Sequence, residues 1–320
     1  MVSCHVEKYN VIGGVVEISE DSRLLRVERG FLIIEEKDSE RRSILARIDL
    51  DQFDTLILSN HGAFISTPLI HNLIERNKSI VLCGKDFMPY SFIYPISGNY
   101  ESAKRIISQT KTTKPLLKRL WQKIVQEKIR NQATVLKLTN NLEAFQKLDL
   151  LANRVLSGDP DNKEAQASRI YWPALMGKDF RRGDDEDIRN HYFNYAYTLT
   201  RSAFCRAIAA FGLLPVFGLH HINQHNFFVL ADDLMEPFRP FLDFYVVNQI
   251  RDLSCSISPE TKKILCRVLI TNVDFNGQKT ILTNSIYGMV SSLLKCYENK
   301  KPELCMPNLF KNVAPLTTSI

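Results

Sequence analysis

Short apolar runs separated by polar turn residues fill the first eighty or so positions of the chain. Each run is rich in β-branched or aromatic side chains and ends at a turn signal such as Glu20-Asp21-Ser22, which is the pattern of β-strands. The predicted strands are residues 15–18, 24–27, 31–35, 44–48, 55–58 and 79–83. We expect an antiparallel meander, followed before the last strand by a short helix with Thr67 as N-cap and Pro68 as first helical residue.

The period of the pattern changes after Pro89, Pro95 and Gly98, and apolar residues then recur at helical spacing. Leu120, Trp121 and neighbouring apolar residues line one face of a basic helix, and further helices are predicted at 187–211, 238–250 and 285–297. We therefore expect an α+β chain with a small β-sandwich-like domain at 1–98 and a larger all-α domain at 99–299. Residues 300–320, with three prolines and no strong period, predict a loose tail.

Composition agrees with an ordinary globular protein. The chain has 320 residues, 45% of them hydrophobic and 24% charged, which is enough for two domains and argues against disorder throughout. Its seven cysteines are scattered and form no CxxC pair, so reduced, mostly buried thiols are expected rather than a zinc site or a disulfide framework. No apolar run is long enough to cross a bilayer and residues 1–20 lack a secretory signal pattern, so we expect a cytoplasmic protein.

The positive charge of the chain is concentrated in one segment. Between residues 101 and 140 there are ten basic residues against two acids, so the rest of a chain of net charge +6 carries −2. The ten are Lys104, Arg105, Lys111, Lys114, Lys118, Arg119, Lys123, Lys128, Arg130 and Lys137. Cations that point outward from a packed helix would suit a phosphate-contacting surface, although an ordinary solvated helix face is the commoner explanation of such charge.

Acidic residues and histidines that could carry chemistry lie in two places. Asp159 is placed to cap a helix starting at Pro160, which would put Glu164 in the second turn on one face with Ser168 and Tyr171. From sequence alone, a glutamate that favours the helix dipole is the simpler explanation. Glu164 is therefore a candidate and not yet a site.

The second place is residues 218–240, which combine imidazoles and carboxylates around an apolar run. Neighbouring side chains point in different directions, so only one of His220 and His221 is expected to face a given site. A capping box made by Asp233 and Glu236 would explain both acids without chemistry. It leaves unexplained why Asp232 and a histidine doublet precede the same helix.

Two carboxylates and one imidazole together would suit Mg²⁺ or Mn²⁺ better than structural zinc. The set would be Glu164, one histidine and either Glu236 or Asp233. Such an ion bridges and polarises a reacting phosphate, and the basic segment would hold the polyanion. The sequence contains neither a GxSxG serine-hydrolase motif nor a GxxxxGK[ST] nucleotide-binding loop.

Four stretches, in order along the chain, resemble the CRISPR-associated adaptation integrase family, and most closely the branch that accompanies type II systems. They are residues 51–66, 158–169, Asn194-Tyr195 and 220–240. The run from His-His to Asp-Asp-Leu-Met-Glu-Pro-Phe-Arg-Pro in the last stretch is highly specific. The chain departs modestly at Ala196, where the family usually has glycine, and at Trp172, which replaces a commoner phenylalanine; neither position is a proposed ligand.

The resemblance implies a metal triad on Glu164, His221 and Glu236, with Asp233 as a secondary candidate and Mg²⁺ or Mn²⁺ as cofactor. It also implies a homodimer joined through the β-rich domain at 1–98, and two such dimers flanking a dimer of the second adaptation protein. Whether the type II effector nuclease joins that complex is left open. The candidate DNA-binding residues are Lys104, Arg105, Lys111, Lys114, Lys118, Arg119, Lys123 and Arg239.

The activity implied by the resemblance is insertion of double-stranded prespacer DNA into CRISPR repeat DNA. A 3′-hydroxyl would attack a phosphodiester at the repeat boundary, without a covalent protein intermediate and without ATP. Two alternatives remain: a stand-alone branched-DNA nuclease with the same site, and a non-catalytic DNA-binding scaffold whose acids serve only as helix caps.

Overall fold

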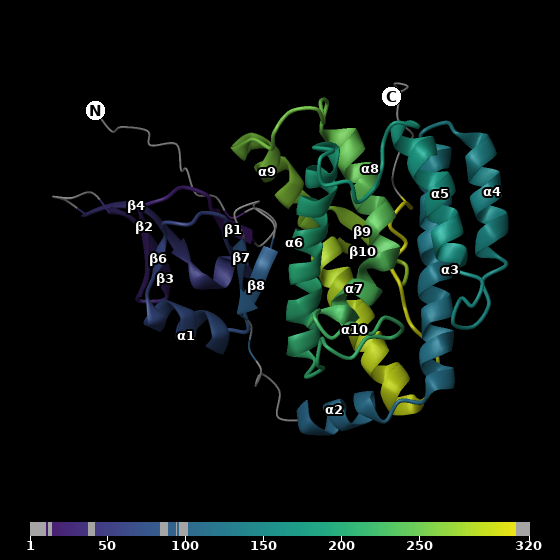
Figure 1. Cartoon of the computed structure of the whole chain (residues 1–320). Helices are drawn as coiled ribbons and strands as arrows, with labels where there is room; N and C mark the ends of the chain where they lie inside the picture. The colour runs from purple at the N-terminus through teal and green to yellow at the C-terminus, as the bar shows by residue number, and fades with distance from the viewer. Residues whose placement is uncertain are drawn as a thin grey trace. The chain divides into compact units, whose positions relative to one another are not determined.

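The computed structural model describes residues 11, 15–37, 42–83, 89–93, 95 and 102–311. It divides into two compact units, Met1–Gly98 and Asn99–Ile320. The first unit is built mainly of strands and the second mainly of helices (Figure 1). The α+β class expected from the change in period is therefore confirmed, while Gly98 itself lies outside the described residues.

Eight strands of the first unit form two four-stranded sheets. One has the order β1 (Val15–Ile18), β5 (Thr55–Leu58), β7 (Ser79–Cys83) and β8 (Pro89–Ile93), and the other has the order β4 (Arg42–Asp49), β3 (Phe31–Lys37), β2 (Arg23–Glu28) and β6 (Phe64–Ile65). All six predicted strands are present, but the single antiparallel meander is wrong, because only β2, β3 and β4 form one. β1, β5 and β7 pair in parallel. Helix α1 (Thr67–Glu75) lies in the crossover from β5 to β7, and the meander of β2, β3 and β4 lies in the crossover from β1 to β5; crossovers of this kind produce parallel pairs.

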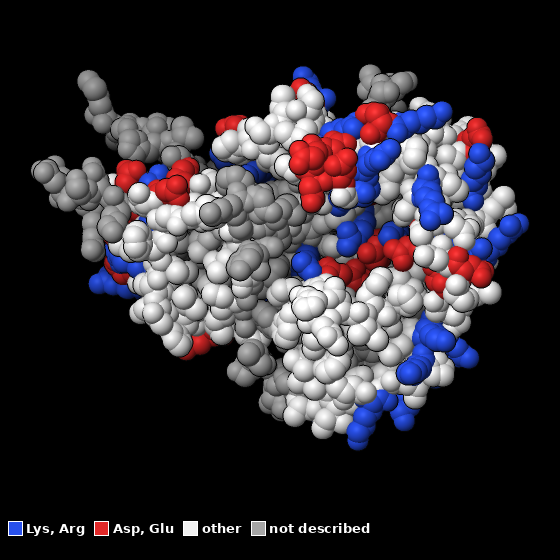
Figure 2. Space-filling view, in the orientation of Figure 1, with Lys and Arg blue, Asp and Glu red and all other residues white. Residues whose placement is uncertain are grey.

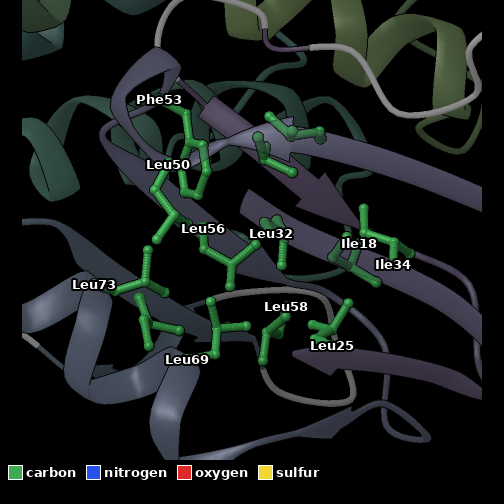
Figure 3. Close-up of a cluster of buried hydrophobic side chains, with 13 residues drawn as sticks. Ile18, Leu25, Leu32, Ile34, Leu50, Phe53, Leu56, Leu58, Leu69 and Leu73 are labelled. Atoms are coloured by element: carbon green, nitrogen blue, oxygen red, sulfur yellow. The ribbon is translucent and has the colours of Figure 1, made fainter. Parts of the chain in front are cut away.

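One apolar core fills the first unit (Figure 3). Leu25 of β2 and Leu56 of β5 are fully buried in it, together with Leu69 and Leu73 of α1. Both sheets thus contribute to the same core, as in a sandwich. The N-cap of α1 is Ser66 rather than the predicted Thr67, which is itself the first helical residue.

Helices of the second unit, in chain order, are α2 (Ser102–Thr110), α3 (Lys114–Leu138), α4 (Leu142–Ala152), α5 (Lys163–Met176), α6 (Arg189–Ala210), α7 (Val229–Met235), α8 (Arg239–Gln249), α9 (Pro259–Cys266) and α10 (Leu282–Asn299). α6 is buried over most of its length and packs against α7, α8 and α10. α3 buries Leu120, Trp121 and Ile124 and packs against α4, α5 and α8. α3 and α6 therefore pack against α5, α7 and α8, the helices in or next to which the candidate site residues lie.

Two features of the second unit differ from the expectation. The all-α description missed a hairpin of β9 (Asn272–Phe275) and β10 (Gln278–Ile281), although its turn pair Asn276-Gly277, both in the left-handed region, is a strong hairpin signal. The loose tail is also wrong for residues 301–311, because Leu309 is buried and Asn308 forms a β-bridge with Asp274. Residues 312–320 lie outside the described part of the chain.

Six of the seven cysteines fall in the described residues, and none of these six forms a disulfide bond. Cys83, Cys205, Cys266 and Cys296 are buried, as the scattered spacing predicted. Cys4 lies outside the described residues. Among the described helices, none combines the length and hydropathy needed to cross a membrane.

Candidate active site

Glu164 is positioned by the first turn of α5. The Asp159 carboxylate accepts hydrogen bonds from the backbone N–H groups of Lys163, at 2.8 Å, and of Glu164, at 3.1 Å, and the Asn162 side chain caps the helix by accepting from Ala165. Asp159 therefore does bind the helix N-terminus, but the predicted start at Pro160 is wrong. The helix begins three residues later, so Glu164 lies in its first turn rather than its second.

Glu236 begins a 3-10 turn, Glu236–Phe238, between α7 and α8. The predicted capping box is wrong, because Asp233 lies within α7 and α8 starts only at Arg239. The Glu236 side chain is buried, with Oε1 2.9 Å from Nε of Arg239. These acids are therefore not helix caps.

A buried lysine of α3 joins the two glutamates. Nζ of Lys128 lies 2.6 Å from Oε1 of Glu164 and 2.5 Å from Oε2 of Glu236. Lys128 was expected to point outward with the other cations of its segment, and that expectation is wrong: only 7% of the residue is exposed. Its place could have been found from spacing, because it lies seven residues after Trp121, on the apolar face of the helix.

The charges of this cluster stabilise one another. Burial by itself would raise the pKa of Glu236, but Arg239 and Lys128 hold that pKa below its ordinary value. Burial lowers the pKa of Lys128, and the attraction of Glu236 and Glu164 more than offsets this, so its pKa is raised. Both groups are therefore charged at neutral pH, and the cluster is a buried ion network rather than a neutral core.

His221 is oriented by Asp233. Nδ1 of His221 lies 2.5 Å from Oδ1 of Asp233, and Oδ2 of Asp233 accepts the backbone N–H groups of Leu219, at 2.7 Å, and His220, at 2.9 Å. This hydrogen bond, reinforced by the charges of Glu164 and Glu236, raises the pKa of His221 despite its partial burial. With Nδ1–H donated to Asp233, the other ring nitrogen, Nε2, carries the lone pair that a ligand would use.

Close packing fixes the loop that carries His221. A Cβ on Gly218 would come within 2.8 Å of Oδ2 of Asp233 and within 2.7 Å of the carbonyl oxygen of His221, so the turn requires glycine. His220 stacks on Trp121 with a ring-centroid distance of 4.6 Å and an interplanar angle of 2°. As expected, the two histidines have different environments: His220 packs on Trp121, and the ring of His221 is oriented by its hydrogen bond with Asp233.

The remaining polar residues of this stretch have other partners. Asp232 pairs with Arg201 at 2.6 Å and accepts a hydrogen bond from Asn226, and His225 is exposed. Both oxygens of Asp233 are occupied by the loop. Within the described residues, no three His, Cys, Asp or Glu side chains converge at metal-ligand spacing; the carboxylates of Glu164 and Glu236 are brought together by Lys128 instead.

A comparison with protein families identifies the chain. The family model described as "CRISPR associated protein Cas1" matches residues 16–258, well over half of the sequence. The chain belongs to the Cas1 family. The CRISPR-associated endonuclease Cas1 of Neisseria meningitidis serogroup C is 35% identical over 247 residues, which cover 77% of this chain and 81% of that protein. The family and the enzyme class expected from the sequence, a nuclease or integrase, are thereby confirmed.

Solved structures share the Cas1 fold of this chain. A casposase bound to its integration product has a TM-score of 0.74 at 19% sequence identity and covers 93% of each chain. A chain of a Cas6-RT-Cas1–Cas2 complex has a TM-score of 0.70 at 19% identity and covers 90% of this chain and 35% of its own. At these identities the likeness concerns the fold, and both units of this Cas1-family chain fall within it.

The predicted DNA-binding cations of this Cas1 chain lie in three settings. Lys104 of α2, Lys111, and Lys114, Lys118 and Arg119 of α3 are exposed. Arg105 donates to the carbonyl oxygen of Phe211, and Lys123 is half-buried. Arg239 is paired with Glu236 inside the site. In Figure 2, acidic side chains lie along a hollow in the helical unit with basic side chains above and beside it.

Proposed function

We propose that this Cas1-family chain is a metal-dependent DNA integrase and endonuclease that inserts prespacer DNA at a CRISPR repeat boundary. The observation that carries the proposal is the pair of glutamates joined by Lys128, beside a histidine whose free nitrogen is set by Asp233. Relatives named as endonucleases and a fold neighbour bound to an integration product support the same chemistry.

Glu164, His221 and Glu236 would hold the metal ion. Their donors fit Mg²⁺ or Mn²⁺, which favour carboxylate oxygens and accept an imidazole nitrogen. The site already accommodates a positive charge between the two carboxylates, where the Lys128 ammonium stands in for a cation. When bound, the ion would polarise the reacting phosphate and stabilise negative charge on the departing oxygen.

The residues around the ligands would hold them ready. Arg239 and Lys128 keep Glu236 ionised, which metal binding requires. Asp233 fixes the ring of His221 so that Nε2, not Nδ1, faces a ligand. Because the contact between Asp233 and His221 exists before substrate arrives, this ligand would need little reorganisation during the reaction.

The proposed reaction is a transesterification. Oxygen of the prespacer 3′-hydroxyl bonds to phosphorus of the repeat DNA, the bond from phosphorus to the repeat 3′-oxygen breaks, and the proton lost by the attacking hydroxyl is balanced by one taken up by the leaving oxygen. One phosphodiester is broken and one is formed, so the reaction needs no ATP.

We further propose that the first unit mediates a homodimer and that the functional assembly includes the second adaptation protein. A structural neighbour that is part of a Cas6-RT-Cas1–Cas2 complex supports the second partner. The DNA partners would be double-stranded prespacer and repeat DNA, and the exposed cations of α2 and α3 would form part of the phosphate-contacting surface.

Strand joining tests the proposal directly. The chain and its partner protein are incubated with Mg²⁺ or Mn²⁺, a short duplex and a supercoiled plasmid that carries a repeat. Joined product is the expected result; cleavage alone would favour the nuclease alternative, and neither would favour the scaffold.

Glu164→Gln and His221→Ala should each lower the joining rate by at least about 100-fold, as expected when a ligand of a catalytic ion is lost. Glu143→Gln is the matched control, because Glu143 holds a first-turn position on α4, is exposed and pairs only with Lys147 among the described residues. Equal joining by Glu164→Gln and Glu143→Gln would show that the metal assignment is wrong.

A further inference from the structure

One apolar side chain of the second unit is almost completely exposed. Ile222 is 95% exposed, whereas the next most exposed large apolar side chain in the described part of the chain, Leu150, is at 59%. Ile222 directly follows His221, the proposed histidine ligand, in the loop of residues 218–228, here called the His221 loop. Single exposed apolar residues are common on protein surfaces, so the significance of Ile222 depends on how this loop is held.

Two neighbouring aspartates of α7 hold the two ends of the His221 loop. Near its start, Asp233 accepts the backbone N–H groups of Leu219 and His220. Near its end, Asp232 accepts a hydrogen bond of 2.6 Å from the side-chain amide of Asn226. This contact gives a role to Asp232, which the capping-box explanation had left without one.

Asn226 is itself fixed by further hydrogen bonds. Its side-chain oxygen accepts from Arg201, at 2.9 Å, and from the backbone N–H of Phe228, at 2.9 Å. Its backbone N–H donates to the carbonyl oxygen of Asn223, which closes a turn. Ile222 therefore lies between two anchored ends, and the loop holds its side chain out in solvent.

The composition of the His221 loop suits contact with DNA. The loop contains no Asp or Glu, and the exposed residues next to Ile222 are His221, Asn223, Gln224 and His225. These side chains offer hydrogen-bonding groups, none of them negatively charged, that can contact phosphates and base edges. A protein-docking surface would instead need a continuous apolar patch, and polar side chains on both sides of Ile222 interrupt one.

An apolar side chain on a well-anchored loop can enter a base step of duplex DNA. Such wedges partly unstack neighbouring base pairs and kink the duplex. The proposed reaction would gain from a kink, because its target is an internal phosphodiester of a stacked duplex, whereas the attacking 3′-hydroxyl lies at a strand end. A kink beside the target phosphate would open the backbone to attack at that point.

We propose that Ile222 inserts into the base step beside the reacting phosphodiester of the repeat duplex, an inference that rests on the proposed function. His221 and Ile222 are consecutive, so a phosphate held next to His221 has its neighbouring base step within reach of the isoleucine. Asp233 and Asp232, the latter through Asn226, fix the loop from which the isoleucine projects. Ile222 thus positions the target strand and takes no part in the bond changes.

Fluorescence of 2-aminopurine, placed at that step of a repeat-containing duplex, tests the proposal. The full chain, its partner protein and a prespacer duplex are mixed with the labelled target in the presence of a chelator, so that unstacking is separated from joining. Wild type should raise the fluorescence at least about twofold as the base leaves the stack, and Ile222→Ser should lose most of this rise. Ile222→Leu should keep it, because leucine is apolar and of similar size.

Joining in Mg²⁺ gives a second readout. Ile222→Ser should join prespacer to an intact target about tenfold more slowly, because serine no longer offsets the free energy of unstacking. A mismatched pair at the same step lowers that free energy, so on a mismatched target the variant should recover to within about threefold of wild type. His221→Ala should not recover, because it lacks a proposed metal ligand. Failure of the mismatch to rescue Ile222→Ser would overturn the wedge.

Leu150→Ser is the matched control. It makes a similar change at an exposed leucine of α4 and should leave fluorescence and joining within about twofold of wild type. If Ile222→Ser and Leu150→Ser behave alike, the wedge is wrong. It is also wrong if Ile222→Ser weakens binding of the partner protein and leaves the fluorescence rise unchanged, because the loop then docks protein. If wild type unstacks the base but neither joins nor cleaves DNA in Mg²⁺, the proposed function fails and the wedge stands.

Discussion

Asp233 does more at the residue scale than a helix cap would. It holds Nδ1 of His221 and two backbone N–H groups of the same loop. Outer-shell carboxylates of this kind typically influence metal affinity or activity by about 10- to 100-fold. We therefore expect Asp233→Asn to weaken Mn²⁺ binding, measured by calorimetry, by a factor in that range.

Its neighbour offers the control. Asp232→Asn changes the adjacent carboxylate, which pairs with Arg201 rather than with His221, and should leave Mn²⁺ affinity within about twofold because it removes no contact to the ligands. If Asp233→Asn and Asp232→Asn lose Mn²⁺ affinity equally, Asp233 does not act through His221.

Lys128 is the second residue whose removal is diagnostic. In metal-free protein, Lys128→Met leaves two glutamates close together without their shared cation, and breaking such a buried pair costs about 3–5 kcal/mol of unfolding free energy. Mn²⁺ should recover part of this loss by taking the place of the ammonium. Urea unfolding with and without Mn²⁺ measures both effects.

Lys123→Met, on the same helix and without an ion pair in the described part of the chain, is expected to change stability little and to respond to Mn²⁺ like wild type. If Mn²⁺ stabilises wild type and both lysine variants equally, Mn²⁺ does not take the place of the Lys128 ammonium.

At the scale of elements, α3 shows what periodicity can and cannot reveal. The helix and its apolar face follow from the spacing of residues such as Trp121 and Ile124. Lys128 and Gln132 lie on that same face, 7 and 11 residues after Trp121, so their inward direction was readable from the sequence. Their partners were not, because Glu164 and Glu236 come from other elements and a helical period carries no information about them.

The loop before α7 shows the same limit. Family resemblance indicated Glu164, His221 and Glu236 as a set, but local pattern assigned Asp233 to a capping box. Its actual partners are a backbone turn and an imidazole 12 to 14 residues earlier in the chain. Such contacts depend on how a loop folds back and not on residue spacing.

Asp243, where α5, α6 and α8 meet, should make the stability of the protein depend on pH. Burial raises the pKa of Asp243 from an ordinary 3.8 to about 7, although hydroxyl groups of Tyr197 and Tyr171 oppose the shift. The folded protein then holds this proton more tightly than the unfolded chain does, so the contribution of Asp243 to stability falls as pH rises from 4 to 7 and is constant above that.

Asp243→Asn should remove this dependence. The unfolding free energy of wild type relative to the variant is expected to fall by on the order of a few kcal/mol between pH 4 and pH 7, since each unit of pKa shift corresponds to about 1.4 kcal/mol. Urea unfolding followed by tryptophan fluorescence checks it. Parallel pH curves for the two proteins would contradict an elevated pKa at Asp243.

A separate prediction concerns DNA binding by the exposed cations at the start of α3. Lys114, Lys118 and Arg119 are exposed, and if each contacts a phosphate, changing all three to Gln should reduce the salt-dependence slope of duplex binding by about 3, at about 0.9 per contact. A control that removes the same charge at Lys147, Lys300 and Lys301, also exposed, should leave the slope unchanged. Similar slopes for both triple variants would assign the effect to net charge alone.

At the scale of the whole molecule, the division into a strand-rich and a helical unit was readable from sequence, whereas strand pairing was not. The runs that form β1 and β5 each read clearly as strands, but they pair with one another across the three-stranded meander between them. Pairing of this kind is set by the shared core of two sheets. Turn signals between consecutive strands therefore could not predict it.

The central claim is that Glu164, His221 and Glu236 hold one divalent cation. Anomalous diffraction from a crystal of the protein soaked in Mn²⁺ tests it most directly. The account predicts a single strong peak in contact with all three side chains and Nζ of Lys128 moved away from its position between the glutamates. Ordered side chains with no peak at this position, and Lys128 still bridging the two glutamates, would contradict it.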